Sequence, residues 1–282
     1  MTSDPELQAT LEHHLKELVR DRSPYLASAG HFYAREYIHQ SLKQWGTVER
    51  DEFQVRGQVY QNLVLRLPGW LDSAAPVVIG AHYDTVPGSP GADDNASGVA
   101  VLLELARAFA QHPLKRPVHL IGFDLEEYGL LGSDHYAEKL KQQYQEIRLM
   151  LSLEMLGYAT TEPNSQHYPA GLKYLYPHRG NFLALVGNLP TLLDLLRLSR
   201  RMRSTGLPCE WLPVVNRGIM VPDVRRSDHA PFWDRDYPAV LVTDTANLRN
   251  PHYHTAEDTL ENLNLDFLTQ VCRGLIVGLS GF

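Results

Sequence analysis

Short apolar runs and longer amphipathic segments alternate along the chain. The apolar run 76–81 is short, β-branched and unbroken, which predicts a strand buried on both faces. Segments with apolar residues every three or four positions predict helices between the short runs. The predicted strands are 51–54, 62–67, 76–81, 118–123, 149–153, 182–186 and 239–243, and the predicted helices are 6–19, 30–45, 97–110, 133–147, 191–202 and 266–279. Because strands alternate with helix-length crossovers, we predict an α/β fold with a mixed, largely parallel central sheet and helices on both faces.

One segment, 156–182, interrupts this alternation because it is rich in Pro, Tyr and Gly. We predict a long loop or lid inserted within a single domain that covers residues 1–282. Its aromatic side chains could line a substrate pocket, although ordinary packing of a long loop is the reading that we favour. These aromatic residues are Tyr158, Tyr168, Tyr174, Tyr176 and Phe182.

The composition excludes several classes of protein. The 282 residues carry a formal charge of −7 and have no basic run, which argues against a nucleic-acid surface. Apolar runs stay well short of the ~18 residues that span a bilayer, and the polar N-terminal segment lacks the features of a secretory signal. Cys209 and Cys272 alone cannot form a disulfide framework or a thiolate metal cluster. We therefore expect a cytoplasmic protein without membrane contact, of unspecified oligomeric state.

Acidic and histidine residues follow the predicted strands, where sites form in open α/β sheets. His82 and Asp84 come directly after the strand 76–81. A single histidine there is more often structural, but an imidazole held by a nearby carboxylate is also a common metal ligand. Glu126 and Glu127 follow the next strand, and two adjacent carboxylates repel each other unless a cation or a proton intervenes. One metal ligand and one general base would resolve that conflict.

Three further positions complete the candidate set. The junction 91–98 contains Asp93 and Asp94, which either cap a helix or supply a carboxylate that bridges two cations. Glu154 ends the strand 149–153, where a carboxylate is costly to bury without a partner. His254 lies in the loop before the last predicted helix and offers the second imidazole.

Five sequence blocks in this order resemble the co-catalytic zinc aminopeptidases of metallopeptidase family 28. That family includes bacterial leucyl aminopeptidases, aminopeptidase Y and relatives of glutamate carboxypeptidase. The blocks are Ala81-His82-Tyr83-Asp84, Gly91-Ala92-Asp93-Asp94-Asn95-Ala96-Ser97-Gly98, Glu126-Glu127-Tyr128-Gly129-Leu130-Leu131-Gly132-Ser133, Ser227-Asp228-His229-Ala230-Pro231-Phe232 and Tyr253-His254-Thr255. The resemblance implies the zinc aminopeptidase fold, which is phosphorylase/hydrolase-like.

The resemblance also implies metal ligands. His82 would bind the first metal, Glu127 and His254 the second, and Asp94 both, since the spacing from His82 favours Asp94 over Asp93 as the bridge. The remaining ligand of the first metal matches Glu154. The relatives usually carry Asp there, so the longer Glu must bind from a backbone set further back or in another mode.

Further roles are implied around these ligands. Asp84 would orient His82, and Glu126 would be the general base. Tyr253 would donate to the tetrahedral oxyanion, with a simple packing role as the equal alternative. Arg226 and Asp228 would line the substrate pocket or orient its residues, or would form a structural ion pair.

The expected cofactor is a pair of zinc ions. Two histidines and three carboxylates without a thiolate suit Zn²⁺, and also Mn²⁺ or Co²⁺. The resemblance favours zinc. The implied reaction is hydrolysis of the N-terminal peptide bond of a peptide or aminoacyl amide by a metal-activated water with a Glu general base.

Two alternatives of a different class share the implied fold. A glutaminyl-cyclase-like acyltransferase would use a single zinc and would lack the full ligand pattern. A non-catalytic binding module would have lost ligands, and here His82, Asp94 and Glu127 are all present. The preferred N-terminal residue stays open, as does an amidase or carboxypeptidase specificity.

Overall fold

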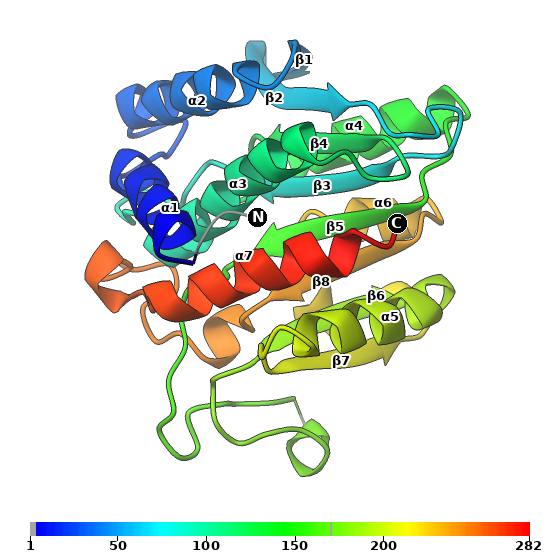
Figure 1. The fold of residues 1–282 in the computed structure, drawn as a ribbon. Coiled ribbons are helices and arrows are strands. Elements are labelled where there is room, and N and C mark those ends of the chain that lie inside the picture. Colours follow the sequence, from blue (N-terminus) through cyan, green and yellow to red (C-terminus); the bar gives the residue numbers. More distant parts are fainter. Residues whose placement is uncertain (1–3, 170) are drawn as a thin grey trace.

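A computed structural model describes residues 4–169 and 171–282 of the chain (Figure 1). The helices are α1 (Asp4–Leu18), α2 (Ser28–Lys43), α3 (Gly98–Gln111), α4 (Leu131–Gln142), α5 (Leu192–Arg203), α6 (Ala230–Asp234) and α7 (Leu265–Leu279). The strands are β1 (Val48–Val55), β2 (Gln58–Leu67), β3 (Val77–His82), β4 (Val118–Phe123), β5 (Leu149–Glu154), β6 (Leu183–Asn188), β7 (Cys209–Val214) and β8 (Ala239–Thr243).

The strands of the described residues form one sheet in the order β1-β2-β4-β3-β5-β8-β6-β7. The four central strands β4, β3, β5 and β8 run parallel. The hairpin β1-β2 is antiparallel to β4, and the parallel pair β6-β7 is antiparallel to β8. The carboxyl ends of the four central strands therefore meet at one edge of the sheet.

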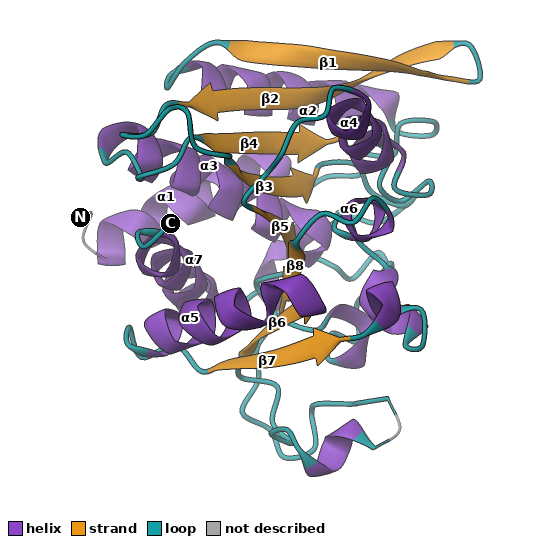
Figure 2. Cartoon of the chain, turned by 90° about the vertical axis from the view of Figure 1, so that its right-hand side faces the viewer, coloured by secondary structure: helices purple, strands orange, loops and turns teal. Residues whose placement is uncertain are grey.

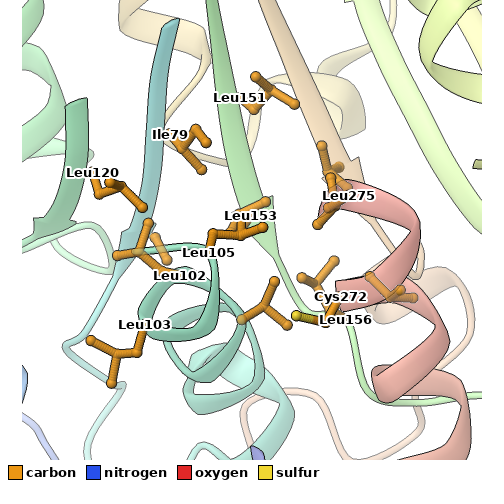
Figure 3. Close-up of a cluster of buried hydrophobic side chains, with 14 of the residues drawn as sticks. Ile79, Leu102, Leu103, Leu105, Leu120, Leu151, Leu153, Leu156, Cys272 and Leu275 are labelled. Atoms are coloured by element: carbon orange, nitrogen blue, oxygen red, sulfur yellow. The ribbon is translucent and has the colours of Figure 1, made fainter. Parts of the chain in front are cut away.

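Helices cover both faces of the sheet (Figure 2). On one face, α1, α2, α3, α5 and α7 pack against strand residues in one large apolar cluster. On the other face, α4 and α6 form a second cluster with the opposite side chains of the same strands. Figure 3 shows Leu102 and Leu105 of α3 beside Ile79 and Leu153 of the central strands, with Leu275 of α7 nearby. Burial on both faces explains why the central strands are mostly apolar.

The predicted fold class is confirmed, and the predicted elements agree closely with the observed ones. Two elements are missing from the prediction, β7 and α6. Strand β7 lies at the edge of the sheet, contains Glu210 and Pro213, and is only partly buried along most of its length, so it lacks an apolar signal. Helix α6 has five residues, which is too short to show a helical period. The predicted helix 133–147 ends at Gln142, before an irregular connection to β5.

Between β5 and β6, the described residues of the irregular segment contain one short helical turn, Leu172–Tyr174. This segment extends past the β7 edge of the sheet in both views (Figures 1 and 2). None of the helices in the described part of the chain is long and apolar enough to cross a membrane.

Two glycines on neighbouring strands give a test of how tightly this sheet is packed. A Cβ atom at Gly80 of β3 would lie 2.2 Å from the ring of Phe123, whereas one at Gly122 of β4 would meet Tyr83 at an ordinary 3.5 Å. Gly80→Ala should therefore lower the free energy of unfolding by about 1–3 kcal/mol, the usual cost of overpacking. Gly122→Ala is the matched control and should be neutral or stabilising by up to ~1 kcal/mol. Urea unfolding curves measure both, and equal midpoints for the two variants would contradict this packing.

Candidate metal centre

His82, the last residue of β3, lies at the centre of a first group of carboxylates. Its Nε2 atom is 3.2 Å from Asp94 Oδ1, 3.5 Å from Glu154 Oε1 and 3.9 Å from Glu126 Oε2. The side chains of His82 and of the three acids are all buried. Single ligand atoms from His82, Glu126 and Glu154 lie within 4.8 Å of one another, close enough to share one metal ion.

A second group lies beside the first and shares Asp94 with it. His254 Nε2 is 3.1 Å from Asp94 Oδ2 and 3.1 Å from Glu127 Oε2. Ligand atoms of these three residues also lie within 4.8 Å of one another. Asp94 therefore presents one oxygen to each histidine and lies between the two groups.

Asp84 connects the ends of β3 and β4. Its two carboxylate oxygens accept the backbone N–H groups of Glu126, at 3.0 Å, and Glu127, at 3.2 Å. The His82 Nδ1 atom lies 3.2 Å from the Asp84 carbonyl oxygen and 3.5 Å from its carboxylate. The turn after β4 passes through Leu125 at φ 56°, a left-handed conformation that brings both glutamate N–H groups toward Asp84. This contact fits the orienting role predicted for Asp84.

The turn Ala92–Ser97 holds Asp94 in place through its neighbour and through Asp258. Asp258 accepts the N–H groups of Asp93, at 2.9 Å, and Asp94, at 3.1 Å. Asp93 points away from both groups and accepts the Gly157 N–H at 2.8 Å and the Asn250 side-chain amide at 2.7 Å. The structure therefore brings Asp94, and not Asp93, into the site, as the spacing suggested. Asp258 lies outside the quoted sequence blocks, and its residue type before a helix is equally typical of a cap.

Glu154 reaches the first group from the last position of β5. Its other oxygen, Oε2, accepts the Ser227 hydroxyl at 2.6 Å, and Ser227 Oγ lies 2.9 Å from Ser152 Oγ. This bond fixes the Glu154 side chain with its other oxygen toward His82. Ser227 belongs to one of the quoted sequence blocks, but nothing in the sequence pointed to its partner.

The electrostatics show an excess of buried negative charge. Burial raises the pKa of Glu126 well above its ordinary value, raises that of Glu154, and raises that of Glu127 to about 7 with help from Asp94. Although burial opposes it, the close imidazoles of His254 and His82 hold the pKa of Asp94 well below its usual range. Burial also opposes protonation of His254, but the close carboxylates of Asp94 and Glu127 raise its pKa to about 9.

These residues fit a pair of divalent cations. The donor set contains imidazole nitrogens and carboxylate oxygens without a thiolate, a combination that suits zinc and also manganese or cobalt. The Glu127 Oε1 atom is buried without a hydrogen-bond partner, and His254 Nε2 faces two carboxylate oxygens without an ordinary hydrogen bond. Such groups are costly to bury unless a cation or a proton joins them.

Tyr253 and Arg226 lie together beside the second group. The Tyr253 ring stacks on His254 with centroids 3.7 Å apart, and its hydroxyl accepts a 3.0 Å hydrogen bond from Arg226 Nη2. Burial raises the pKa of Tyr253 far above its ordinary value, so the hydroxyl keeps its proton. Tyr253 is thus a neutral donor at the site.

Asp228 does not occupy the predicted place in a pocket wall. It is buried beneath the first group, and neither oxygen accepts a hydrogen bond of ordinary geometry, although the Ser133 hydroxyl lies nearby. Burial raises its pKa to about 7. It forms no ion pair with Arg226, whose guanidinium bonds to Tyr253 instead.

A pocket of about 930 Å³, counted to its open mouth, adjoins Glu154, Ser227 and Tyr253. Its floor consists of alternate residues of the paired strands β6 and β8, namely Ala184, Val186, Leu241 and Thr243. Its walls include the aromatic residues Tyr168, Tyr176, Phe182 and Trp211, together with Arg226. Three aromatics of the irregular segment thus line the pocket, contrary to the packing role that we favoured, whereas Tyr158 and Tyr174 do not. The sequence analysis did not predict this role because the pocket forms where β6 pairs with β8, and that pairing is visible only in the structure.

The chain is similar in sequence to known peptidases. A sequence model described as peptidase family M28 matches residues 62–182 and 212–277. The uncharacterized protein YfbL of Escherichia coli (strain K12) is 36% identical over 86% of this chain and 77% of its own length. Aminopeptidase YwaD of Bacillus subtilis (strain 168) is 30% identical over 76% of this chain and 42% of its own length.

Solved structures share the fold. A zinc aminopeptidase from Bacillus subtilis, BSAP, is 27% identical with a TM-score of 0.60, over 80% of this chain and 50% of that one. The glutaminyl cyclase of Macrostomum lignano is 20% identical with a TM-score of 0.70, over 97% of this chain and 88% of that one. The chain thus spans about half the length of the two aminopeptidases compared.

The buried charges predict that stabilisation by metal increases with pH. Carboxyls with a folded pKa of about 7, namely Glu127 and Asp228, hold protons in the folded state that the unfolded chain releases above ~4.5, so their burial destabilises the metal-free protein as pH rises. His254 stabilises below ~6.5, and that contribution is lost as pH rises through 9. Metal binding displaces these protons and adds about 2.7 kcal/mol at a hundredfold excess over Kd.

Thermal unfolding between pH 5 and 8, in chelator and in excess Zn²⁺, measures the difference. The melting temperature in chelator should fall with pH, and the zinc-induced increase should grow. An increase in melting temperature of the same size at pH 5 and pH 8 would contradict the assignment of Glu127 to a cation site.

Proposed function

This chain belongs to peptidase family M28, and we propose that it is a two-metal aminopeptidase that removes apolar N-terminal residues from peptides. The predicted resemblance to these hydrolases is confirmed by the family match and by the aminopeptidases among its relatives. The observation that carries the proposal is the position of Asp94. One of its carboxylate oxygens faces His82 and the other faces His254, as a bridging ligand between two cations requires.

The proposed ligands follow from the two groups around Asp94. His82 and Glu154 would complete the first position, and Glu127 and His254 the second. Held there, divalent cations would supply Lewis-acid chemistry, which would polarise a scissile carbonyl and lower the pKa of a bound water. Asp84 and Ser227 keep His82 and Glu154 in place, so the ligands are preorganised by their neighbours.

Glu126 is the proposed general base. It lies within the first group, 3.9 Å from His82 Nε2, yet its carboxylate has no side-chain hydrogen bond that would fix it. Its raised pKa suits a group that accepts a proton from the attacking water and then passes it to the leaving amine. A Glu126 carboxylate oxygen also lies where it could bind a metal, and substitution by Gln separates the two roles.

Tyr253 is the proposed donor to the tetrahedral oxyanion. Its hydroxyl accepts a hydrogen bond from Arg226, which orients the O–H toward the site and leaves its proton free to donate. The Arg226 charge also lies over the ring, with its guanidinium carbon 5.4 Å from the centroid. These contacts support a donor role for Tyr253 beside the second group.

The apolar pocket suggests the class of N-terminal residue. Its floor and aromatic walls adjoin Glu154, so a side chain extending from the scissile bond would enter it. Removing a leucine or phenylalanine side chain from water would stabilise the bound substrate by about 1.5–3 kcal/mol.

A glutaminyl cyclase activity is the second candidate, because that fold is shared. The second group of ligands argues against it, since a single-zinc transferase needs only one. A substrate panel that contains an N-terminal glutaminyl peptide separates the two activities.

The general-base role predicts that Glu126→Gln keeps the metals and loses turnover. The amide is the same size but cannot accept the water proton, so kcat should fall by about 10²–10⁴-fold. Glu127→Gln is the matched control on the neighbouring residue and should lose metal as well as activity. Zinc per chain by elemental analysis and hydrolysis of leucyl-p-nitroanilide measure both. Loss of zinc in Glu126→Gln would make Glu126 a ligand, and unchanged turnover would exclude it as the base.

The pocket predicts a size-dependent effect of Ala184→Phe. A phenyl ring on the floor of the pocket would fill the space that a large N-terminal side chain needs. Since each lost methylene contact changes kcat/KM by about 10–200-fold, cleavage of leucyl and phenylalanyl substrates should fall strongly, and cleavage of alanyl substrates much less. Ala184→Gly leaves the pocket open and is the control. An equal loss for all three substrates would remove this pocket from substrate binding.

A further inference from the structure

The connection between α1 and α2 contacts the loops of the metal centre although it lies outside the segments that match the family. The family match begins at residue 62, whereas this connection includes the five residues 21–25, which we call the N-terminal clamp. Its contacts are with the loop after β3 and with the loop after β4. These are the loops that carry Asp94, Glu126 and Glu127.

Arg22 is the centre of the clamp and one of the largest fully buried side chains of the described residues. Its guanidinium donates to carbonyl oxygens on both sides of the connection. The distances are 2.8 Å from Nε to Tyr83, 2.6 Å and 3.2 Å from Nη1 to Leu18 and Arg20, 2.9 Å from Nη1 to Pro90, 3.0 Å from Nη2 to Gly91 and 3.5 Å from Nη2 to Asp94. Its backbone N–H also donates to Thr85 Oγ1 at 2.8 Å. A single side chain thus joins the end of α1 to the end of β3 and to the segment that leads into Asp94.

The contacts are close enough to fix that segment. Gly91 has φ 62°, and a Cβ atom there would lie 2.7 Å from Arg22 Nη2 and 2.3 Å from the Asp94 carbonyl oxygen. Asp94 is three residues further along the chain. Its two carboxylate oxygens lie 3.2 Å from His82 Nε2 and 3.1 Å from His254 Nε2. Movement of the segment would displace the one carboxylate that both groups share.

The positive charge of Arg22 also stabilises the acidic residues of the metal centre. Among the described residues no carboxylate oxygen lies within ion-pair distance of its guanidinium, so carbonyl oxygens satisfy its donors. The acidic groups that interact electrostatically with it include Asp94 and Glu127, and also Asp258 and Asp84, which accept backbone N–H groups beside these residues. A fixed positive charge there offsets part of their mutual repulsion without occupying a ligand position.

Two more clamp residues reach the same loops. Asp21 accepts the Gly88 N–H at 2.8 Å, and Ser23 Oγ lies 3.0 Å from the hydroxyl of Tyr128, the residue after Glu127. The Tyr25 ring packs edge-on against Tyr128 with centroids 4.8 Å apart. The clamp therefore contacts both loops that supply ligands from β3 and β4.

We propose that Arg22 is a positioning residue of the metal centre, which holds the segment 90–94 so that Asp94 faces both groups of ligands. The inference rests on the proposed function for the identity of the ligands. It makes the N-terminal clamp part of the active centre, and not only a cover for the sheet.

Two variants test the proposal in the full chain. Arg22→Met keeps length and apolar volume but removes charge and donors, and Arg22→Lys keeps the charge but cannot reach carbonyls on both sides. The matched control is Arg148→Met, which breaks a bidentate pair with Asp194 before the start of β5. The measurements are the Kd values of both zinc equivalents, by competition with a chromogenic chelator, and amide hydrogen exchange of residues 91–97 in EDTA.

Arg22→Met should raise both zinc Kd values by about 10- to 100-fold, with a smaller rise for Arg22→Lys. The amides of residues 91–97 should exchange faster in both variants. Arg148→Met should lower the melting temperature without changing either Kd. Wild-type Kd values and exchange in a folded Arg22 variant would overturn the proposal. Failure of both variants to fold at 25 °C, judged by circular dichroism, would also overturn it in favour of a role in folding alone.

A failure of the proposed function would give a different result. If the wild-type chain binds no zinc, the ligand assignment is wrong. The exchange of the amides of residues 91–97 in EDTA still decides whether Arg22 holds the segment, because that measurement does not depend on metal.

Discussion

Six carboxylates are buried around two histidines at the carboxyl edge of the central strands, and their repulsion is the constraint on which the site depends. They are Asp84, Asp94, Glu126, Glu127, Glu154 and Asp228. Burying an unpaired ion costs several kcal/mol, so the folded chain must neutralise this charge by protons, by hydrogen bonds or by cations. The raised pKa values of Glu126, Glu127 and Asp228 show that hydrogen bonds alone do not suffice.

The acids of this region fall into two kinds by how their oxygens are satisfied. Asp84, Asp93 and Asp258 each accept at least two N–H groups, and these bonds join strand ends and loops to one another. Among the described residues, no N–H group donates an ordinary hydrogen bond to the carboxylate of Glu126 or Glu127, and the Glu127 Oε1 atom is buried without a partner. Carboxylates of the first kind shape the backbone, whereas those of the second kind keep lone pairs available for a cation or a proton. This difference is the physical basis for separating ligands from scaffold.

The proposed ligands can be located in the sequence because they follow strands that are easily recognised. His82, Glu126, Glu127 and Glu154 sit at or just after buried apolar runs, and parallel strands bring those ends together. The partners that orient them are harder to predict. Asp258 is 164 residues from Asp94, and Ser227 is 73 residues from Glu154, so only the fold reveals either contact. The edge strand β7 and the pocket that it borders were missed because a half-exposed strand with Pro213 carries no apolar pattern.

The proposed metal ligands and base lie in different parts of the chain from the residues that position them and line the pocket. The proposed ligands and base all lie in the segments 62–182 and 212–277 that match the family. Arg22 lies before them, and Ala184, Val186 and Trp211 of the pocket lie in the unmatched segment between them. Hydrolysis constrains the ligand geometry tightly, whereas a pocket floor can change shape as long as it stays apolar and adjoins the site. Differences between this chain and its relatives are therefore expected first in the preferred N-terminal residue, and only afterwards in the metal centre itself.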